Sequence, residues 1–128
     1  MILKILLSWF CIMAIAIING ALRDLLYKNK LGKKRADQIS TFSLLLLISI
    51  FTFFFQRLFP LSSLNESIII GVYWFVFTEI FEFLAGHYIF KKTWHELIIS
   101  YDLFNGQLWI LIPIWMAVIN LVIYKAIN

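Results

Sequence analysis

The chain has 128 residues, of which 62% are hydrophobic and 14% charged, and its mean hydropathy is +0.91. This composition excludes an ordinary water-soluble domain and is typical of one all-α membrane domain over residues 1–128. The net charge of +4 comes from basic residues gathered in one loop rather than spread among stacking aromatics, so we expect no nucleic-acid partner.

The first predicted element is a membrane-spanning helix over residues 2–22. The stretch is apolar and has about the 20 residues that cross a ~30 Å hydrocarbon core. Asn19-Gly20-Ala21 is a poor cleavage site, so we expect a retained helix rather than a signal peptide. Arg23 follows at its end, with Asn19 one turn earlier on nearly the same face. Arg23 either reaches the lipid headgroups or turns into the bundle and meets an acid.

The second predicted span covers residues 39–56 and follows a basic loop. The loop carries Lys28, Lys30, Lys33, Lys34 and Arg35. Asp37 and Gln38 mark the start of the helix, where an acid is favourable. The hydroxyl side chains inside the span are expected to bond to the backbone and to pack against other helices.

The third predicted span, residues 68–86, carries two carboxylates. Glu79 and Glu82 are three residues apart and therefore lie about 60° from each other around a helix. An ionisable side chain that meets lipid costs a few kcal/mol. We therefore expect this face to point into the bundle or toward water.

The connector after Gly86 predicts a short interfacial helix before the fourth span, residues 108–126. Thr93 and Glu96 have the spacing of a capping box that opens a helix. Apolar side chains then recur at helical spacing: Trp94, Leu97, Ile98 and Tyr101. Such a face suits the membrane interface. The alternative is a plain extension of the third and fourth spans into the cytoplasm.

The distribution of Lys and Arg predicts the orientation. The first and third connections carry eight basic residues: Arg23, Lys28, Lys30, Lys33, Lys34, Arg35, Lys91 and Lys92. The opposite side carries Lys4, Arg57 and Lys125. Basic loops stay in the cytoplasm, so we expect an inner-membrane protein with both termini in the periplasm.

This orientation brings polar side chains from several spans to the cytoplasmic end. The predicted cluster consists of Asn19, Arg23, Gln38, Glu79, Glu82 and His87. Arg23 and Glu82 are its expected ion pair, and Glu79, one turn deeper, is expected to be protonated or bonded to a neutral partner. The cluster either binds something or only locks the helices together.

Catalytic and cofactor motifs are missing from the sequence. Metal-binding motifs such as HExxH and CxxC are absent, and no nucleophile stands beside a base. His87 and His95 both fall in the connector, away from the bilayer centre where a haem would need them. The single cysteine, Cys11, lies inside the first span and cannot form an intrachain disulfide. We therefore predict no metal, no cofactor and no catalytic residue.

Several short motifs give the chain a resemblance to known proteins. They are Ala21-Leu22-Arg23-Asp24, Leu31-Gly32 before Ala36-Asp37-Gln38, Phe81-Glu82-Phe83, Gly86-His87-Tyr88, Trp94, and Tyr101-Asp102-Leu103 leading to Gly106-Gln107-Leu108-Trp109. With these motifs the chain resembles a set of small four-span bacterial membrane proteins that have no assigned activity. The resemblance implies a four-span fold and supplies no substrate, cofactor or catalytic residue.

Three functions fit this pattern. The leading hypothesis is a non-enzymatic protein whose polar cluster binds a lipid headgroup or a partner subunit, which could be a second copy of the chain or another membrane protein. The second is a small oligomeric transporter or channel in which Glu79 or Glu82 carries a proton or cation. The third is an intramembrane lipid-modifying enzyme with Glu82 and His87 as acid and base.

Overall fold

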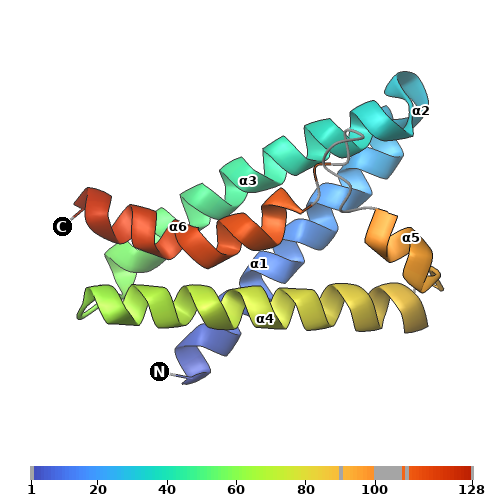
Figure 1. The fold of residues 1–128 in the computed structure, drawn as a ribbon. Helices are drawn as coiled ribbons and strands as arrows, with labels where there is room; N and C mark the ends of the chain where they lie inside the picture. Colours follow the sequence, from blue (N-terminus) through green and yellow to red (C-terminus); the bar gives the residue numbers. More distant parts are fainter. Residues whose placement is uncertain (1, 90, 100–107, 109, 128) are drawn as a thin grey trace.

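The computed structural model describes residues 2–89, 91–99, 108 and 110–127, and every regular element within them is helical (Figure 1). The long helices are α1 (Ile2–Leu22), α3 (Lys33–Leu58), α4 (Leu64–Tyr88) and α6 (Leu111–Ile127). The short elements are the π-helix η1 (Arg23–Tyr27), α2 (Lys28–Leu31) and α5 (Trp94–Ile99). The predicted all-α fold is confirmed for this part of the chain.

The long helices have the length and surface of membrane spans. Within the described residues, three stretches are long and apolar enough to cross a membrane: Ile2–Leu31, Lys33–Leu58 and Leu64–Tyr88. The apolar α6 is shorter, at 17 residues. Large apolar side chains such as Phe10, Leu46, Phe54 and Ile80 point outward and are more than half exposed. An outer surface of this kind suits lipid and indicates a helical membrane bundle.

The segment predicted to be a basic loop is instead mostly helical. Residues 23–31 form η1 and α2, and α3 already begins at Lys33 rather than near residue 39. The chain breaks at Gly32, whose φ of 84° lies in the left-handed region that favours glycine. Lys, Arg, Ala and Leu are good helix formers, and a helix can extend beyond the bilayer once charge makes its surface polar. The prediction equated the end of the apolar run with the end of the helix.

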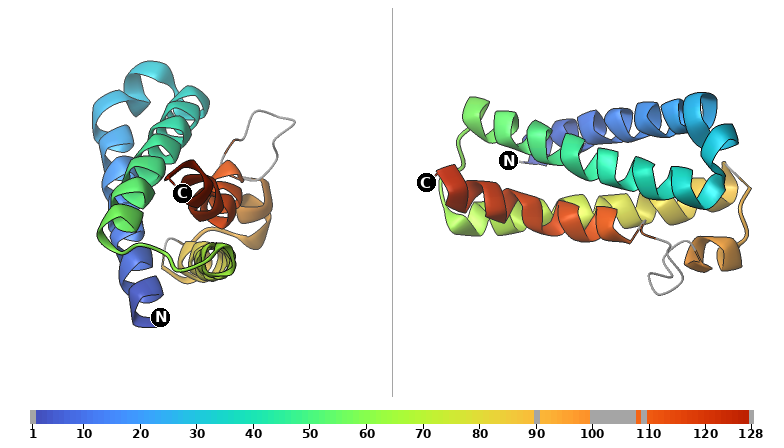
Figure 2. Two further views of the ribbon diagram at one scale, coloured as in Figure 1. Left: turned by 90° about the vertical axis from the view of Figure 1, so that its left-hand side faces the viewer. Right: turned by 90° about the horizontal axis from the view of Figure 1, so that it is seen from above.

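The four long helices form two pairs. Figure 2 shows α1 beside α3 and α4 beside α6, with the pairs packed against each other. α6 runs antiparallel to α4 and also contacts α3. α1 crosses α4 and then runs away from it, so the two helices diverge toward the end of the molecule that holds α2 and α5 (Figure 1). The end of α1, the start of α3 and the end of α4 all lie toward this end of the molecule.

The α4–α6 interface is the tightest in the bundle. A Cβ atom added to Gly71 of α4 would lie 2.1 Å from the backbone carbonyl oxygen of Ala117 in α6. Trp74 and Met116, both fully buried, continue the contact along the two helices. Such an approach of backbones needs a small residue at the crossing. This interface therefore leaves no room between its helices.

Polar side chains tie the helices together inside the apolar core. Three indole N–H groups donate to hydroxyl oxygens on other helices: Trp9 to Thr78 (3.1 Å), Trp74 to Ser8 (3.1 Å) and Trp115 to Ser49 (2.8 Å). The hydroxyls themselves bond onward, as Ser8 does to the carbonyl of Ile5. In an apolar medium these bonds satisfy groups that lipid cannot. Within the second predicted span, Ser49 both accepts the indole N–H of Trp115 and donates to the backbone carbonyl of Leu45, as the sequence predicted.

Two further sets of hydrogen bonds between helices lie toward the end of the bundle opposite α2 and α5. Gln56 of α3 donates through Nε2 to the backbone carbonyl and to Oδ1 of Asn120 in α6, at 2.9 and 3.1 Å. Lys4 of α1 donates to Oε1 of Glu66 in α4 at 2.8 Å, and Ser62 donates its backbone N–H and its hydroxyl to Oε2. Glu66 therefore has a partner on each carboxylate oxygen and acts as a structural tie.

Candidate functional site

A π-helical turn carries the first charged side chains of the site. In η1 the backbone N–H of Lys28 donates to the carbonyl of Arg23, five residues earlier. A π turn is wider than an α turn and is often found at functional sites. Here it extends α1 past the apolar stretch and places Arg23, Asp24 and Lys28 near the start of α3.

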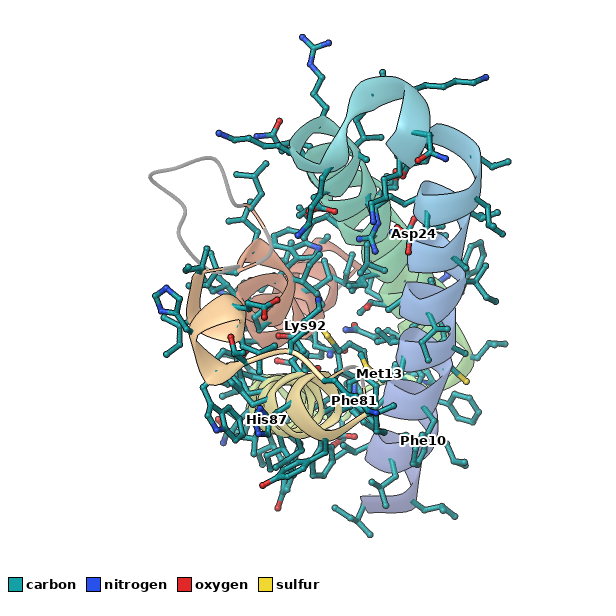
Figure 3. All side chains as sticks on the ribbon, turned by 90° about the vertical axis from the view of Figure 1, so that its right-hand side faces the viewer. Phe10, Met13, Asp24, Phe81, His87 and Lys92 are labelled. Atoms are coloured by element: carbon teal, nitrogen blue, oxygen red, sulfur yellow. The ribbon has the colours of Figure 1, made fainter. Side chains whose placement is uncertain are left out.

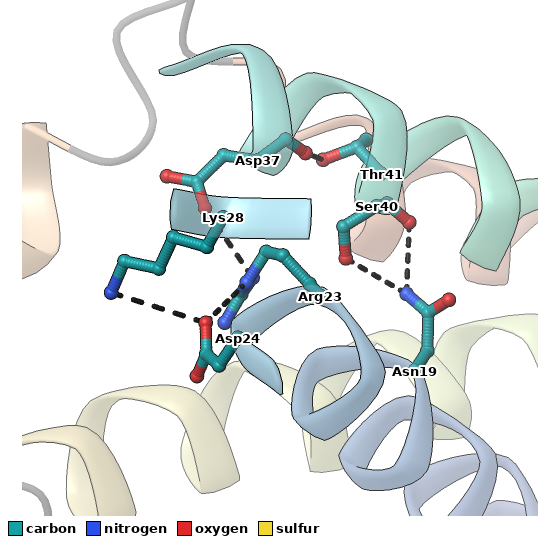
Figure 4. A network of polar contacts seen from close by, with 7 residues as sticks. All are labelled: Asn19, Arg23, Asp24, Lys28, Asp37, Ser40 and Thr41. Atoms are coloured by element: carbon teal, nitrogen blue, oxygen red, sulfur yellow. Dashed lines mark hydrogen bonds and ion pairs between the residues drawn. The ribbon is translucent and has the colours of Figure 1, made fainter. Parts of the chain in front are cut away.

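These side chains form an ion network with α3 (Figure 4). Arg23 donates from Nε to Oδ1 of Asp24 at 3.0 Å, and its Nη1 lies 3.4 Å from Oδ1 of Asp37. Nζ of Lys28 lies 3.9 Å from the same Oδ1 of Asp24. Arg23, with 22% of its side chain exposed, turns into the bundle and meets acids, as one of the two alternatives predicted. The carboxylates that Arg23 contacts are those of Asp24 and Asp37, which were not predicted as its partners.

Asn19, one turn before Arg23, bonds to α3 and takes no part in the ion network. Its Nδ2 donates to the backbone carbonyl and to Oγ of Ser40 in α3, both at 2.9 Å, and the side chain is buried (Figure 4). This pair of bonds holds α1 against α3 beneath the ion network.

The connector after α4 confirms the predicted capping box. Oγ1 of Thr93 accepts the backbone N–H of Glu96 at 3.1 Å, and the Glu96 carboxylate accepts the backbone N–H of Thr93 at 3.3 Å. The helix that follows, α5, is described for six residues, and the predicted interfacial residue Tyr101 lies outside the described part of the chain. Trp94 and Ile98 are exposed, as a membrane-facing side requires, but Leu97 is buried.

Leu97 fixes α5 to the end of α4. A Cβ atom added to Gly86 would lie 2.7 Å from Cδ2 of Leu97. Leu97 therefore packs into the space that the glycine leaves because it has no side chain. His87 stacks on Trp94 with ring centroids 3.9 Å apart, and its Nδ1 donates to the carbonyl of Lys92 at 2.9 Å. These contacts hold the connector, and Lys92 with it, against α4.

A cavity of about 620 Å³ lies between η1, α3, the end of α4 and the connector. We call it the charged cavity. Its charged lining consists of Arg23, Asp24, Lys28, Lys33, Asp37, Glu82 and Lys92. Its apolar lining includes Ala16, Ile17, Gly20, Ala21, Phe81, Phe83, Leu97 and Leu108. Figure 3 shows Asp24 on the η1 side, Lys92 on the connector side and Phe81 on α4. The diverging course of α1 and α4 creates this space.

The charges of the cavity are not evenly matched. Four cationic side chains face three carboxylates, a formal net charge of +1. Arg23 and Lys28 are engaged with Asp24 and Asp37. Lys33 and Lys92 make no ion pair within the described residues, although Lys92 is near enough to Asp24 to attract its carboxylate. Two ammonium groups are therefore available to an anionic ligand.

The predicted cluster is spread over this end of the molecule rather than gathered in one place. Arg23 and Glu82 line the charged cavity, and their predicted ion pair stays a prediction. Asn19 and His87 make the contacts with Ser40 and Trp94 described above. Gln38 and Glu79 are half-buried and make interactions of their own. Neither lines the cavity.

Sequence reasoning missed five of the charged lining residues: Asp24, Lys28, Lys33, Asp37 and Lys92. One signal was present, because Asp24 and Lys28 have the i,i+4 spacing of a helical ion pair. Lys33 and Lys92 are separated by the whole of α3 and α4, and only the fold brings them to one cavity.

The chain matches no protein-family model, no curated protein and no solved structure. Among the described residues, no three His, Cys, Asp or Glu side chains come close enough to hold a metal ion.

Proposed function

We propose that the protein is a four-span inner-membrane protein that binds the headgroup of a phosphate-bearing lipid in the charged cavity. The observation that carries this proposal is the pairing of two ammonium groups, on Lys33 and Lys92, with a wall of small and apolar side chains in one space. A lipid headgroup presents the same combination, because its phosphate is charged and its glycerol and acyl carbons are not. Neither a soluble anion nor an acyl chain alone accounts for both parts of the lining.

The membrane arrangement supports this reading. The mostly apolar α6, 17 residues long, serves as the fourth span beside the three longer stretches. α5 lies at the interface, with Trp94 and Ile98 toward lipid and Leu97 toward Gly86. The basic end, with η1, α2 and the connector, faces the cytoplasm and its anionic leaflet, which leaves both termini in the periplasm. Labelling of Lys33→Cys by an impermeant thiol reagent outside intact cells would refute this orientation.

A matched pair of variants tests the headgroup site. Lys33→Gln with Lys92→Gln removes both available ammonium groups, whereas Lys30→Gln with Lys34→Gln removes two charges from the same basic segment outside the cavity. A Lys near an anionic headgroup contributes about 1 kcal/mol. The first variant should therefore retain phospholipid with an affinity lower by roughly tenfold or more, and the control should match the wild type.

Native mass spectrometry of the purified proteins in a mild detergent provides the measurement, because it reports bound lipid and oligomeric state together. Equal lipid retention in the two variants would reject the headgroup site. A lipid-free oligomer that conducts protons or cations in liposomes, and loses this activity with Glu82→Gln, would favour the transporter alternative instead.

A further inference from the structure

The carboxylates of the charged cavity indicate which lipid headgroup fits there. This inference rests on the proposed function. Three of the four segments around the cavity contribute one each: Asp24 from η1, Asp37 from α3 and Glu82 from α4. An ionised carboxylate only accepts hydrogen bonds, so a ligand that fills this space must bring donors as well as a phosphate. A site that binds only phosphate would not be expected to have acids on three of its sides.

Asp24 offers a defined acceptor. Its contacts with Arg23 and Lys28 both use Oδ1, and within the described residues its Oδ2 accepts no hydrogen bond. Figure 4 shows this second oxygen directed away from both cations. Asp37 is similar, because Arg23 contacts its Oδ1. Both acids therefore keep one oxygen for a donor that does not come from the ion network.

The same acids limit the negative charge that the cavity accepts. Arg23 and Lys28 are already neutralised by Asp24 and Asp37, so the formal charge left over is that of Lys33 and Lys92 against Glu82, or +1. One phosphate charge balances it. A second negative charge, as on a phosphomonoester, would exceed this net charge, because the described lining has no further cationic side chain to balance it.

We infer that the cavity selects phosphodiester lipids whose headgroups carry hydrogen-bond donors, because Lys33 and Lys92 line the same cavity as Glu82 and as Asp24, whose Oδ2 accepts no hydrogen bond within the described residues. The phosphate lies at the two ammonium groups, and the hydroxyl or ammonium donors of the headgroup bond to the acids. Phosphatidylglycerol and phosphatidylethanolamine both have this chemistry. Phosphatidylcholine lacks the donors. Phosphatidic acid lacks the donor-bearing headgroup, and its phosphomonoester carries a second negative charge.

Competition among the four lipids tests the inference. Delipidated wild-type protein is mixed with an equimolar set of phosphatidylglycerol, phosphatidylethanolamine, phosphatidylcholine and phosphatidic acid with identical acyl chains, and bound lipid is read by native mass spectrometry. The first two should be retained roughly tenfold over the last two, as expected for one charged hydrogen bond gained or one repulsion added. Phosphatidylethanolamine above phosphatidylglycerol identifies an ammonium donor, and the reverse order identifies hydroxyl donors.

Variants on α4 separate selection from simple binding. Glu82→Gln should lower the discrimination against phosphatidic acid by roughly tenfold, because it removes one negative charge from the lining. Glu79→Gln, one turn away and outside the cavity lining, is the matched control and should keep the wild-type ranking.

Retention of all four lipids equally by the wild type would overturn the inference and leave the headgroup site standing. Retention of none would overturn the proposed function itself. The wild-type ranking needs no variant and decides the question even if Glu82→Gln fails to fold.

Discussion

The α4–α6 interface and the space between α1 and α4 are built in opposite ways along the same helix. At Gly71 the backbones of α4 and α6 come so close that a methyl group has no room. Toward the other end of α4, that helix and the end of α1 have diverged (Figure 1), and charged side chains from η1, α2, α3, α4 and the connector line a cavity. The contact at Gly71 is made by backbone atoms and continued by apolar side chains such as Trp74 and Met116, whereas the cavity is lined by charged side chains, of which Lys33 and Lys92 make no ion pair within the described residues. The first region holds the bundle together, and the second is where a ligand can enter.

The largest effect on stability is expected for Gly71→Ala. The new methyl group would lie 2.1 Å from the carbonyl oxygen of Ala117, and a backbone atom inside a helix cannot move aside. Separating α4 from α6 should cost about 3 kcal/mol. Thermal unfolding in detergent measures it. Gly20→Ala is the control, because its methyl group meets only Nη2 of Arg23 at an ordinary 3.6 Å and should leave the unfolding temperature unchanged or slightly higher.

An intermediate effect is expected for Gln56→Leu in the neutral α3–α6 tie. The substitution removes the donor to Asn120 and leaves the buried Oδ1 of that residue without a partner, at a cost of about 2 kcal/mol. Oε1 of Gln56 and Nδ2 of Asn120 have no hydrogen-bond partner in the described structure, so the pair is only partly satisfied. Gln56→Leu with Asn120→Leu should therefore unfold at a higher temperature than Gln56→Leu alone. The opposite order would show that the amide pair contributes more than its unmade bonds cost.

The smallest of the three effects is expected for Gly86→Ala, the same substitution on the same helix as Gly71→Ala. Its methyl group would lie 2.7 Å from Cδ2 of Leu97, but that atom is the far end of a flexible side chain and can move. The cost should be about 1 kcal/mol or less and should affect only the seating of α5. Hydrogen exchange of the α5 amides should increase while the exchange of α4 amides before Gly86 stays unchanged. A loss as large as that of Gly71→Ala would mean that α5 is part of the bundle core.

The apolar spans and the capping box were predictable from sequence because their causes are local. A run of apolar residues needs only lipid, and Thr93 with Glu96 needs only one turn of helix. The limits of α3 were not predictable, since nothing in the apolar pattern shows that the basic segment before it is helical. The partners of Arg23 depend on the π turn and on the position of α3, which join Asp24 and Asp37 around one guanidinium. Glu82 was predicted as part of a polar cluster and lines the cavity, but Lys33 and Lys92 of the same lining come from distant segments of the chain.

The short α6 sets the thickness of membrane that the bundle fits. At 1.5 Å per residue, its 17 residues extend about 26 Å, whereas the 25 residues of α4 extend about 38 Å. α6 therefore covers α4 for somewhat less than the ~30 Å depth of a hydrocarbon core, and about 12 Å of α4 is left beyond it. That remainder lies at the basic end, where α5 is seated. The depth of the charged cavity is thus linked to bilayer thickness, because a thicker membrane would draw the uncovered end of α4 into hydrocarbon and a thinner one would leave it in water.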